Sequence, residues 1–178
     1  LYNASAVGCS EIVLLLLNCH AEQVADKNEV TPLHMASFRG SVPCVEALLQ
    51  HGASVQAKDT FGHIPLHLAC KGHREVAELL VEKGSSIEEK EKAGNTPLMF
   101  SCAGGHAELV KFLLGKGARA DAKNSAGQTA LNFACQGGHI ACVKLLLEAD
   151  CYQNCTLVFL VPNIPLSSSS GHTSSPSK

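Results

Sequence analysis

One phrase recurs four times in this chain and limits the folds that it can adopt. The copies read "TPLHMASFRG", "IPLHLACKG", "TPLMFSCAGG" and "TALNFACQGG", and they begin at Thr31, Ile64, Thr96 and Thr129. Their spacings are therefore 33, 32 and 33 residues. Self-similarity at a fixed period of this length indicates a stacked repeat architecture. Counting back from Thr31, residues 1–20 fill the slots of one more unit, so the sequence holds five units, the first without its opening residues.

The residue pattern of each unit predicts a helix, a turn and a second helix. A threonine at the start of three copies suits a helix N-cap, and the proline that follows in three copies suits the first helical position. Glycines end the first helix at Gly40, Gly72, Gly105 and Gly138, and the second helix at Gly52, Gly84 and Gly117. Between them an apolar stripe follows the i, i+3, i+4 spacing of one helix face, at Val45/Leu48/Leu49, Ala77/Leu80/Val81, Val110/Leu113/Leu114 and Val143/Leu146/Leu147.

A single helical hairpin has too little interior to bury such a stripe, whereas stacked units merge their stripes into one core. Small residues recur in the slots where the helices of adjacent units would meet. These are Ala36, Ala69, Ser101 and Ala134 in one column, and Ser37, Cys70, Cys102 and Cys135 in the next. The predicted fold class is therefore an all-α solenoid.

The four phrases, together with the repeated Gly-His and Leu-Leu-x-x-Gly steps, resemble ankyrin repeats over residues 1 to about 148. We assign residues 1–150 to the repeat domain, with units at about 1–28, 29–61, 62–93, 94–126 and 127–150. The resemblance implies antiparallel helix pairs joined by β-hairpin "fingers". It also implies protein binding along the fingers and the concave face of the inner helices.

The two ends depart from the repeat. Asp150 and His20 stand where a closing glycine belongs, and residues 151–178 form a non-repeat tail, with an apolar segment followed by a Ser-rich end that we expect to be disordered. Residues 156–161 either fold back as a cap or do not belong to the native array, and we favour the second. Because the chain also lacks an initiator Met, we expect it to be a piece of a longer solenoid.

Composition excludes several classes of function. The net charge of −2 with no basic stripe argues against nucleic acid as a partner. The longest apolar run, within "EIVLLLLNC", is too short to insert across a membrane, and no signal peptide is evident. The nine cysteines are odd in number and several fall on buried slots, which predicts reduced thiols and an intracellular location, cytoplasmic or nuclear. We expect a monomer.

No catalytic, cofactor-binding or metal-binding residues are predicted. The nine histidines follow the repeat, and no pair has the i, i+4 spacing of a zinc helix. "CAGGH" and "CQGGH" bring Cys and His together only because both phrases occupy the same repeat slot. No nucleophile or phosphate-loop motif is present, so the chain is predicted not to be an enzyme.

Functional side chains should then lie at positions that the repeat does not require. Transferred slot by slot from the resembled family, the candidate protein-binding residues are Lys27, Asn28, Val30, Phe38, Arg39, Thr60, Phe61, His63, Lys71, Lys92, Asn95, Ser125, Gln128 and Gln136. Phe38, Arg39 and Phe61 are the candidate anchors, since aromatic and Arg side chains dominate binding energy at interfaces. The alternative is that both rings pack on a neighbouring finger and that Arg39 is solvated. The charged stretch "EEKEK" at 88–92 is interpreted as a solvated fingertip.

Several substitutions predict local weakness. Glu29 replaces the glycine found at Gly62, Gly94 and Gly127, which costs strain if the turn needs a positive φ. The third unit lacks one residue, so its first helix should be shorter. Met99 and Asn132 replace the His of the phrase, which predicts weaker capping toward the C-terminal end.

Function is therefore predicted to be non-catalytic protein–protein interaction, as a scaffold or adaptor, with the partner unidentified. The alternative is a substrate-recognition arm of a larger enzyme or channel whose active part lies outside this sequence.

Overall fold

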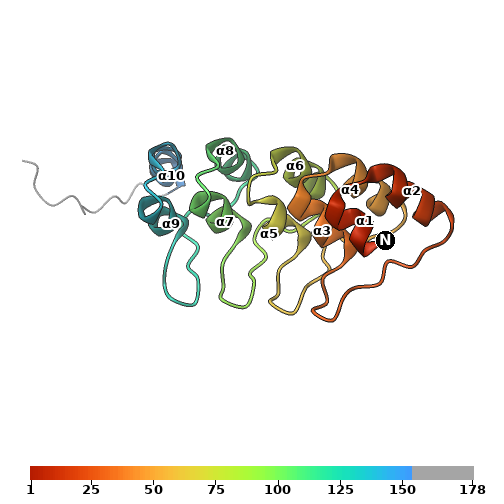
Figure 1. The fold of residues 1–178 in the computed structure, drawn as a ribbon. Helices are drawn as coiled ribbons and strands as arrows, with labels where there is room; N and C mark the ends of the chain where they lie inside the picture. Colours follow the sequence, from red (N-terminus) through yellow and green to blue (C-terminus); the bar gives the residue numbers. More distant parts are fainter. Residues whose placement is uncertain (154–178) are drawn as a thin grey trace, which may run out of the picture.

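The repeats fold into stacked helical pairs (Figure 1). The computed structural model describes residues 1–153, and within that range there are ten helices. Their bounds are α1 Tyr2–Val7, α2 Ser10–Asn18, α3 Pro32–Arg39, α4 Val42–Gln50, α5 Pro65–Ala69, α6 Arg74–Glu82, α7 Pro97–Ala103, α8 Ala107–Gly115, α9 Ala130–Gln136 and α10 Ile140–Gln153.

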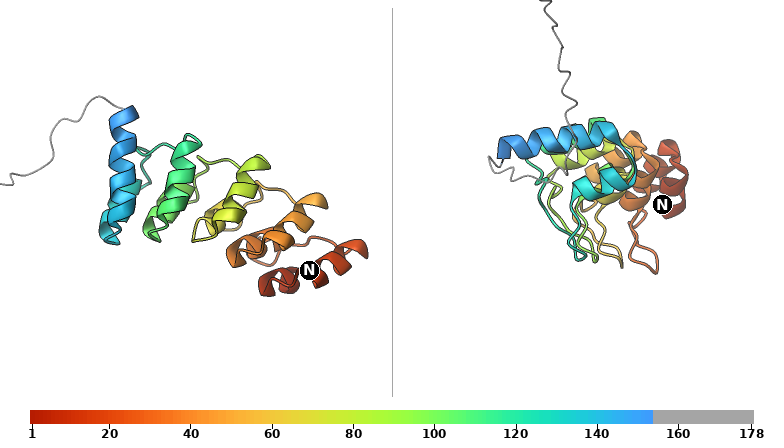
Figure 2. Two further views of the ribbon diagram at one scale, coloured as in Figure 1. Left: turned by 90° about the horizontal axis from the view of Figure 1, so that it is seen from above. Right: turned by 90° about the vertical axis from the view of Figure 1, so that its left-hand side faces the viewer.

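The helices form two layers. The inner layer is α1, α3, α5, α7 and α9, the outer layer is α2, α4, α6, α8 and α10, and each helix contacts its neighbours in the same layer. Four loops, here called the fingers, lead from each outer helix to the next inner helix; they comprise residues 19–31, 51–64, 83–96 and 116–129. All four project from the same side of the helices, as the end-on view in Figure 2 shows. The predicted α-solenoid is confirmed, and the described fingers are hairpin turns that form no strand.

The core runs along the junction of the two layers. The predicted stripe of the outer helices is buried at Val45, Leu48, Leu80, Val110 and Leu113, whereas Leu147 of the last unit is exposed. The column of small residues at Ala36, Ala69, Ser101 and Ala134 is fully buried, so inner helices of adjacent units lie close together. These contacts join each unit to the next, which is the source of stability in a linear array.

Helix capping differs between the units. The side chain of Thr31 accepts a hydrogen bond from the backbone of His34, as predicted for an N-cap. Thr96 makes no such bond, and its buried hydroxyl has no partner among the described residues, because Met99 cannot take the place of the histidine. The prediction for the fifth unit was wrong. Asn132 Oδ1 accepts from Thr129 N at 2.8 Å and so performs the histidine's role.

The seven glycines predicted to end helices lie in the left-handed region, with φ between 68° and 137°. Two non-glycine residues adopt the same conformation: His20 with φ 58° and Glu29 with φ 59°. At the Glu29 slot the other fingers carry glycines with φ of 82°, 80° and 74°. The predicted strain at Glu29 therefore has a backbone cause.

Glu29→Gly should stabilise the protein by about 0.5–1 kcal/mol, because relief of a left-handed side chain outweighs the extra freedom of glycine in the unfolded state. The measurement is the urea midpoint of the two proteins. Lys27→Gly on the same finger, where φ is not positive, is the control and should be neutral or destabilising. A Glu29→Gly protein that unfolds at lower urea than the parent contradicts this account.

Two helix lengths differ from the regular pattern. The first helix of the third unit, α5, has five residues against seven or eight in α3, α7 and α9, which confirms the prediction of a shorter helix. The last helix, α10, has 14 residues against nine in α4, α6 and α8. It continues through Asp150, since the slot that should hold a glycine stop holds a residue that helices accept.

Both ends of the described array expose apolar side chains. Ile12 and Leu15 on α2 are exposed at one end, and Ile140 and Leu147 on α10 at the other. Cys135, predicted to lie in a buried column, is exposed because no further inner helix covers it in the described part of the chain. The expectations for residues 156–161 and for the Ser-rich end fall outside the described residues.

Candidate functional site

Each fingertip is held by one carboxylate or amide side chain. Asp59 Oδ1 accepts from Phe61 N at 2.9 Å and from His63 N at 2.8 Å, which closes the turn around the tip. Asp26 and Asn124 make the same pair of bonds in their own fingers. Glu91 makes it with both of its carboxylate oxygens. The tips therefore have a fixed backbone shape, because the side chain satisfies amides that would otherwise turn to water.

Neighbouring fingertips are joined by main-chain hydrogen bonds. Thr60 N donates to Asn28 O, Lys92 N donates to Phe61 O, and Ser125 N donates to Ala93 O. The N···O distance is 2.9 Å in each of the three bonds. One bond of the same type thus links each finger to the next. The fingers lie side by side (Figure 1), and these bonds connect them into one row.

The phrase histidines add a second link between fingers. His34 Nδ1 accepts from Thr31 N at 3.1 Å, so its Nε2 carries the proton and donates to His63 O at 2.9 Å in the next finger. His67 Nδ1 likewise accepts from Ile64 N, and its Nε2 donates to Glu89 O at 3.1 Å. Burial lowers the pKa of His34, and burial together with the nearby charge of His63 lowers the pKa of His67 to about 4. Both imidazoles are neutral donors at physiological pH.

Aromatic rings from adjacent units meet beside these links. Phe100 on α7 lies edge-on to His63 and His67, with ring centroids 5.6 and 5.4 Å apart. Phe61 is 5.9 Å from His63 by the same measure. Lys71 Nζ lies 5.7 Å from the Phe38 centroid and 5.8 Å from that of Phe100. We call Phe38, Phe61, His63, Lys71 and Phe100 the aromatic cluster; it spans three units.

His63 within this cluster is held by Asp59. Its Nδ1 lies 3.0 Å from Asp59 Oδ2, in a pair that is largely buried. Burial raises the pKa of the Asp59 carboxyl, but hydrogen bonds from the His63 side chain and backbone outweigh that effect and leave it below its usual range. Asp59 is thus an anion that fixes both the fingertip and the ring beside it.

The predicted binding residues fall into three groups. Four of them, Phe38, Phe61, His63 and Lys71, come together in the aromatic cluster. Phe38 is 44% exposed and Phe61 is 61% exposed, so neither ring is covered by a neighbouring finger. The tips carry Lys27, Asn28, Thr60, Lys92 and Ser125, of which all but Thr60 are exposed, and the half-buried positions just before the inner helices carry Val30, Asn95 and Gln128.

Two predicted residues lie apart from the cluster. Arg39 is exposed, but its Nε donates to Ala6 O on α1, so the expectation that Arg39 is either an anchor or simply solvated misses this contact. Gln136 lies at the end of α9 in the last unit and is exposed.

The interpretation of "EEKEK" as a solvated tip was wrong for Glu91 and for the two glutamates that begin the stretch. Glu91 is only 9% exposed because it closes its own fingertip, and Glu89 pairs with Lys58 at 2.7 Å. Glu88 accepts from Arg119 N in the next finger. The stretch is a connector between fingers.

Sequence reasoning did not identify Phe100 or the tip-closing residues, although both leave a signal. Asp26, Asp59, Glu91 and Asn124 recur at intervals of 33, 32 and 33 residues, which is the period of the phrase itself. Met35, Leu68, Phe100 and Phe133 occupy one column of large, half-buried side chains on the inner helices. A search for every residue type at the repeat period finds both sets.

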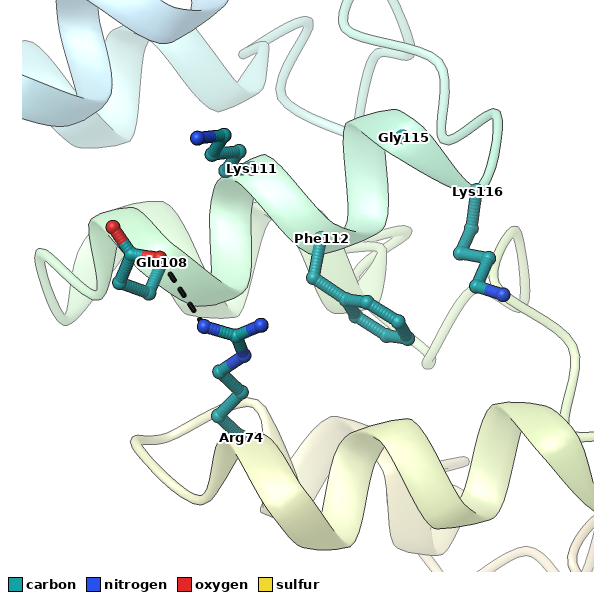
Figure 3. A pocket seen from close by; sticks show the side chains of 6 residues that line it. All are labelled: Arg74, Glu108, Lys111, Phe112, Gly115 and Lys116. Carbon is teal, nitrogen blue, oxygen red and sulfur yellow. Dashed lines mark hydrogen bonds and ion pairs between the residues drawn. The ribbon is translucent and has the colours of Figure 1, made fainter.

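A groove of about 330 Å³ lies on the other layer, between the outer helices α6 and α8 (Figure 3). Arg74 Nη1 and Glu108 Oε2 are joined across it at 3.2 Å, and Lys116 Nζ lies 5.7 Å from the Phe112 centroid. Both members of the ion pair are well exposed, and such pairs contribute little to stability. The groove offers no buried polar group for orienting a ligand.

Reactive groups are sparse in residues 1–153. Burial raises the pKa of the Cys70 and Cys102 thiols to about 12, which leaves both protonated and poorly nucleophilic. No group of three or more potential metal ligands occurs in this range. No helix in it has the length and apolar character to cross a membrane.

The sequence is similar to known proteins of one repeat family. The family described as "Ankyrin repeats (3 copies)" matches residues 1–91 and 86–156, and repeats of this kind generally mediate protein–protein interaction and are typically non-catalytic. A putative ankyrin repeat protein of Rickettsia bellii is 49% identical over 39 residues, which are 22% of this chain and 16% of that protein. Protein phosphatase 1 regulatory subunit 27 of Homo sapiens is 39% identical over 46 residues, which are 25% of this chain and 30% of the subunit, and its Mus musculus counterpart gives the same figures. The chain thus matches less than a third of the length of each of these relatives.

Proposed function

The chain belongs to the ankyrin repeat family, and on that premise we propose that it is a non-catalytic scaffold or adaptor module that binds a protein partner through its fingertips and inner helices. The aromatic cluster is the observation that carries this proposal. Exposed Phe38 lies beside Lys71, and exposed Phe61 joins the same cluster through His63. Aromatic side chains of this kind supply most of the energy at protein interfaces.

The rigidity of the surrounding frame supports the same function. Tip-closing side chains, bonds between fingertips and the His34 and His67 links order the fingers before any partner arrives. A preformed surface avoids the entropy cost of ordering loops on binding, so more of the contact energy appears as affinity. We place the module inside the cell, in the cytoplasm or nucleus, as a monomer, with neither nucleic acid nor a membrane as its partner.

The test is selection of peptides from a displayed random library on the full chain, followed by affinity measurements on the selected peptides. Phe61→Ala and Phe38→Ala should each weaken binding at least tenfold while the circular dichroism spectrum stays unchanged, since both rings are exposed. Phe112→Ala on α8 is the matched control, because this half-buried phenylalanine lies in the outer layer and should leave affinity within twofold. Failure to select any saturable binder, or binders sensitive only to Phe112→Ala, would overturn the proposal.

A second candidate follows from the similarity to protein phosphatase 1 regulatory subunit 27. In it, the module is the recognition arm of a larger enzyme. Titration of the chain with purified protein phosphatase 1 tests this candidate directly. Saturable binding that Phe61→Ala abolishes supports this candidate. Absence of binding at high micromolar concentration excludes protein phosphatase 1 as the partner.

A further inference from the structure

Lys71 lies between two rings of the aromatic cluster and pairs with no carboxylate of residues 1–153. Its ammonium lies at almost equal distances from the rings of Phe38 in the preceding unit and Phe100 in the following one. Cation–π attraction to two rings positions the charge but leaves its N–H groups free to donate. Lys71 makes no ion pair or side-chain hydrogen bond with any residue in 1–153.

Three other cations of the described array are paired with carboxylates. Lys58 pairs with Glu89, and Arg119 with Asp121, among the described residues. The arginine of the outer groove, Arg74, pairs with two glutamates. Lys71 therefore differs from these in keeping an unmatched charge beside exposed apolar surface.

Three acidic residues of the fingers bind backbone N–H groups. The carboxylates of Asp26, Asp59 and Glu91 accept hydrogen bonds from the amides of their own fingertips. The exposed side chains at the tips include Lys27 and Lys92, against one exposed carboxylate, Glu29. Although the whole chain carries a net charge of −2, exposed cations outnumber exposed anions among these residues and Lys71.

We infer that the cluster is a docking site for an acidic segment of the protein partner, in which one carboxylate binds Lys71 and flanking apolar side chains pack on Phe38 and Phe61. This inference rests on the proposed function and names the chemistry of the partner. Charge complementarity carries it, because a carboxylate supplies the anion that Lys71 lacks.

The experiment uses the peptides selected on the full chain, each labelled with fluorescein and measured by anisotropy. The selected sequences should share an Asp or Glu next to an apolar residue. Lys71→Glu should weaken their binding at least tenfold, and Lys71→Met should weaken it less, because methionine keeps the apolar stem. Replacing the shared acidic residue of the peptide with Lys should restore binding to the Lys71→Glu protein.

Lys116→Glu is the matched control, since Lys116 also lies over a phenylalanine ring, but in the outer groove. Affinity in this variant should stay within twofold of the parent. A single-stranded oligothymidine competitor separates the acidic segment from any polyanion, and it should not displace the peptides at equal concentration.

The outcomes separate this inference from the function beneath it. Peptides that lose affinity with Phe61→Ala but not with Lys71→Glu, or that share no acidic position, would overturn the inference and leave the proposed function standing. Displacement by the oligothymidine would also overturn it, in favour of a general anion site. Peptides insensitive to Phe38→Ala and Phe61→Ala would overturn both.

Discussion

Gly40→Ala is expected to lower the free energy of unfolding by about 3 kcal/mol, through a left-handed backbone penalty and a steric overlap that add. Gly40 has φ 74°, and a Cβ built there would lie 2.2 Å from His73 Nδ1 and 2.6 Å from its Cγ. His73 is the N-cap of α6, so its backbone is fixed and the ring can escape the overlap only by rotating about its Cα–Cβ bond. The substitution therefore disrupts the packing of the second unit against the third. Urea unfolding followed by circular dichroism measures the loss.

Gly52→Ala provides the matched control for the overlap. Its φ of 84° carries the same backbone penalty, but a Cβ there meets nothing within 4 Å. We expect a loss of about 1–2 kcal/mol from this variant. In the double variant Gly40→Ala/His73→Ala, removal of the ring should recover most of the difference between the two glycine variants. Equal losses at Gly40 and Gly52 would show that the histidine contact carries no energy.

Acidification from pH 7 to pH 4 is expected to remove about 3 kcal/mol of stability through His67 alone. Its pKa is about 4 in the folded protein and near 6.5 when unfolded, so the unfolded chain takes up the proton first as the pH falls. Stability is complete above pH 6.5 and declines until about pH 4, below which this residue causes no further loss. His34, whose pKa is also lowered, adds to the decline in the same direction. His63 and Glu91 are the charged groups that act on His67, with opposite signs.

The fifth unit supplies the variant that tests this. Asn132 already accepts from the N-cap amide without titrating. His67→Asn should therefore keep the cap bond, cost stability at pH 7 through loss of the link to Glu89 O, and flatten the profile between pH 6.5 and pH 4. Urea midpoints across that range are the measurement. A parallel decline in the parent and in His67→Asn would assign the acid sensitivity to other groups.

Sequence reasoning predicted the features that depend on backbone conformation. A glycine slot filled by Glu29 gave a positive φ, and a missing residue gave a short α5, because both follow from the repeat register alone. It failed where different side chains place a hydrogen-bond acceptor at the same position. Asn132 puts an amide oxygen where a histidine puts Nδ1, and Glu91 reaches with two oxygens where an aspartate uses one.

The candidate site shows the same limit at a larger scale. Phe38 and Phe61 could be selected because they lie in variable slots. The repeat period finds the column that holds Phe100, but that column is apolar in every unit and looks like core, so the period does not mark Phe100 as a site residue. Its role comes from the stacking of three units, which brings it within reach of Lys71 and His63 at once. Spacing along the chain does not report which side chains of different units converge.

The bonds between fingertips have a consequence for how sequences can change. Thr60, Lys92 and Ser125 each donate their main-chain N–H, and the acceptors are main-chain carbonyls. The side chains at these three positions play no part in that row of bonds. They are free to be varied, in nature or in a library, while the scaffold beneath them keeps its shape. Exchange of the outermost side chains can therefore change which partner this surface binds, while the backbone of the fingers keeps its conformation.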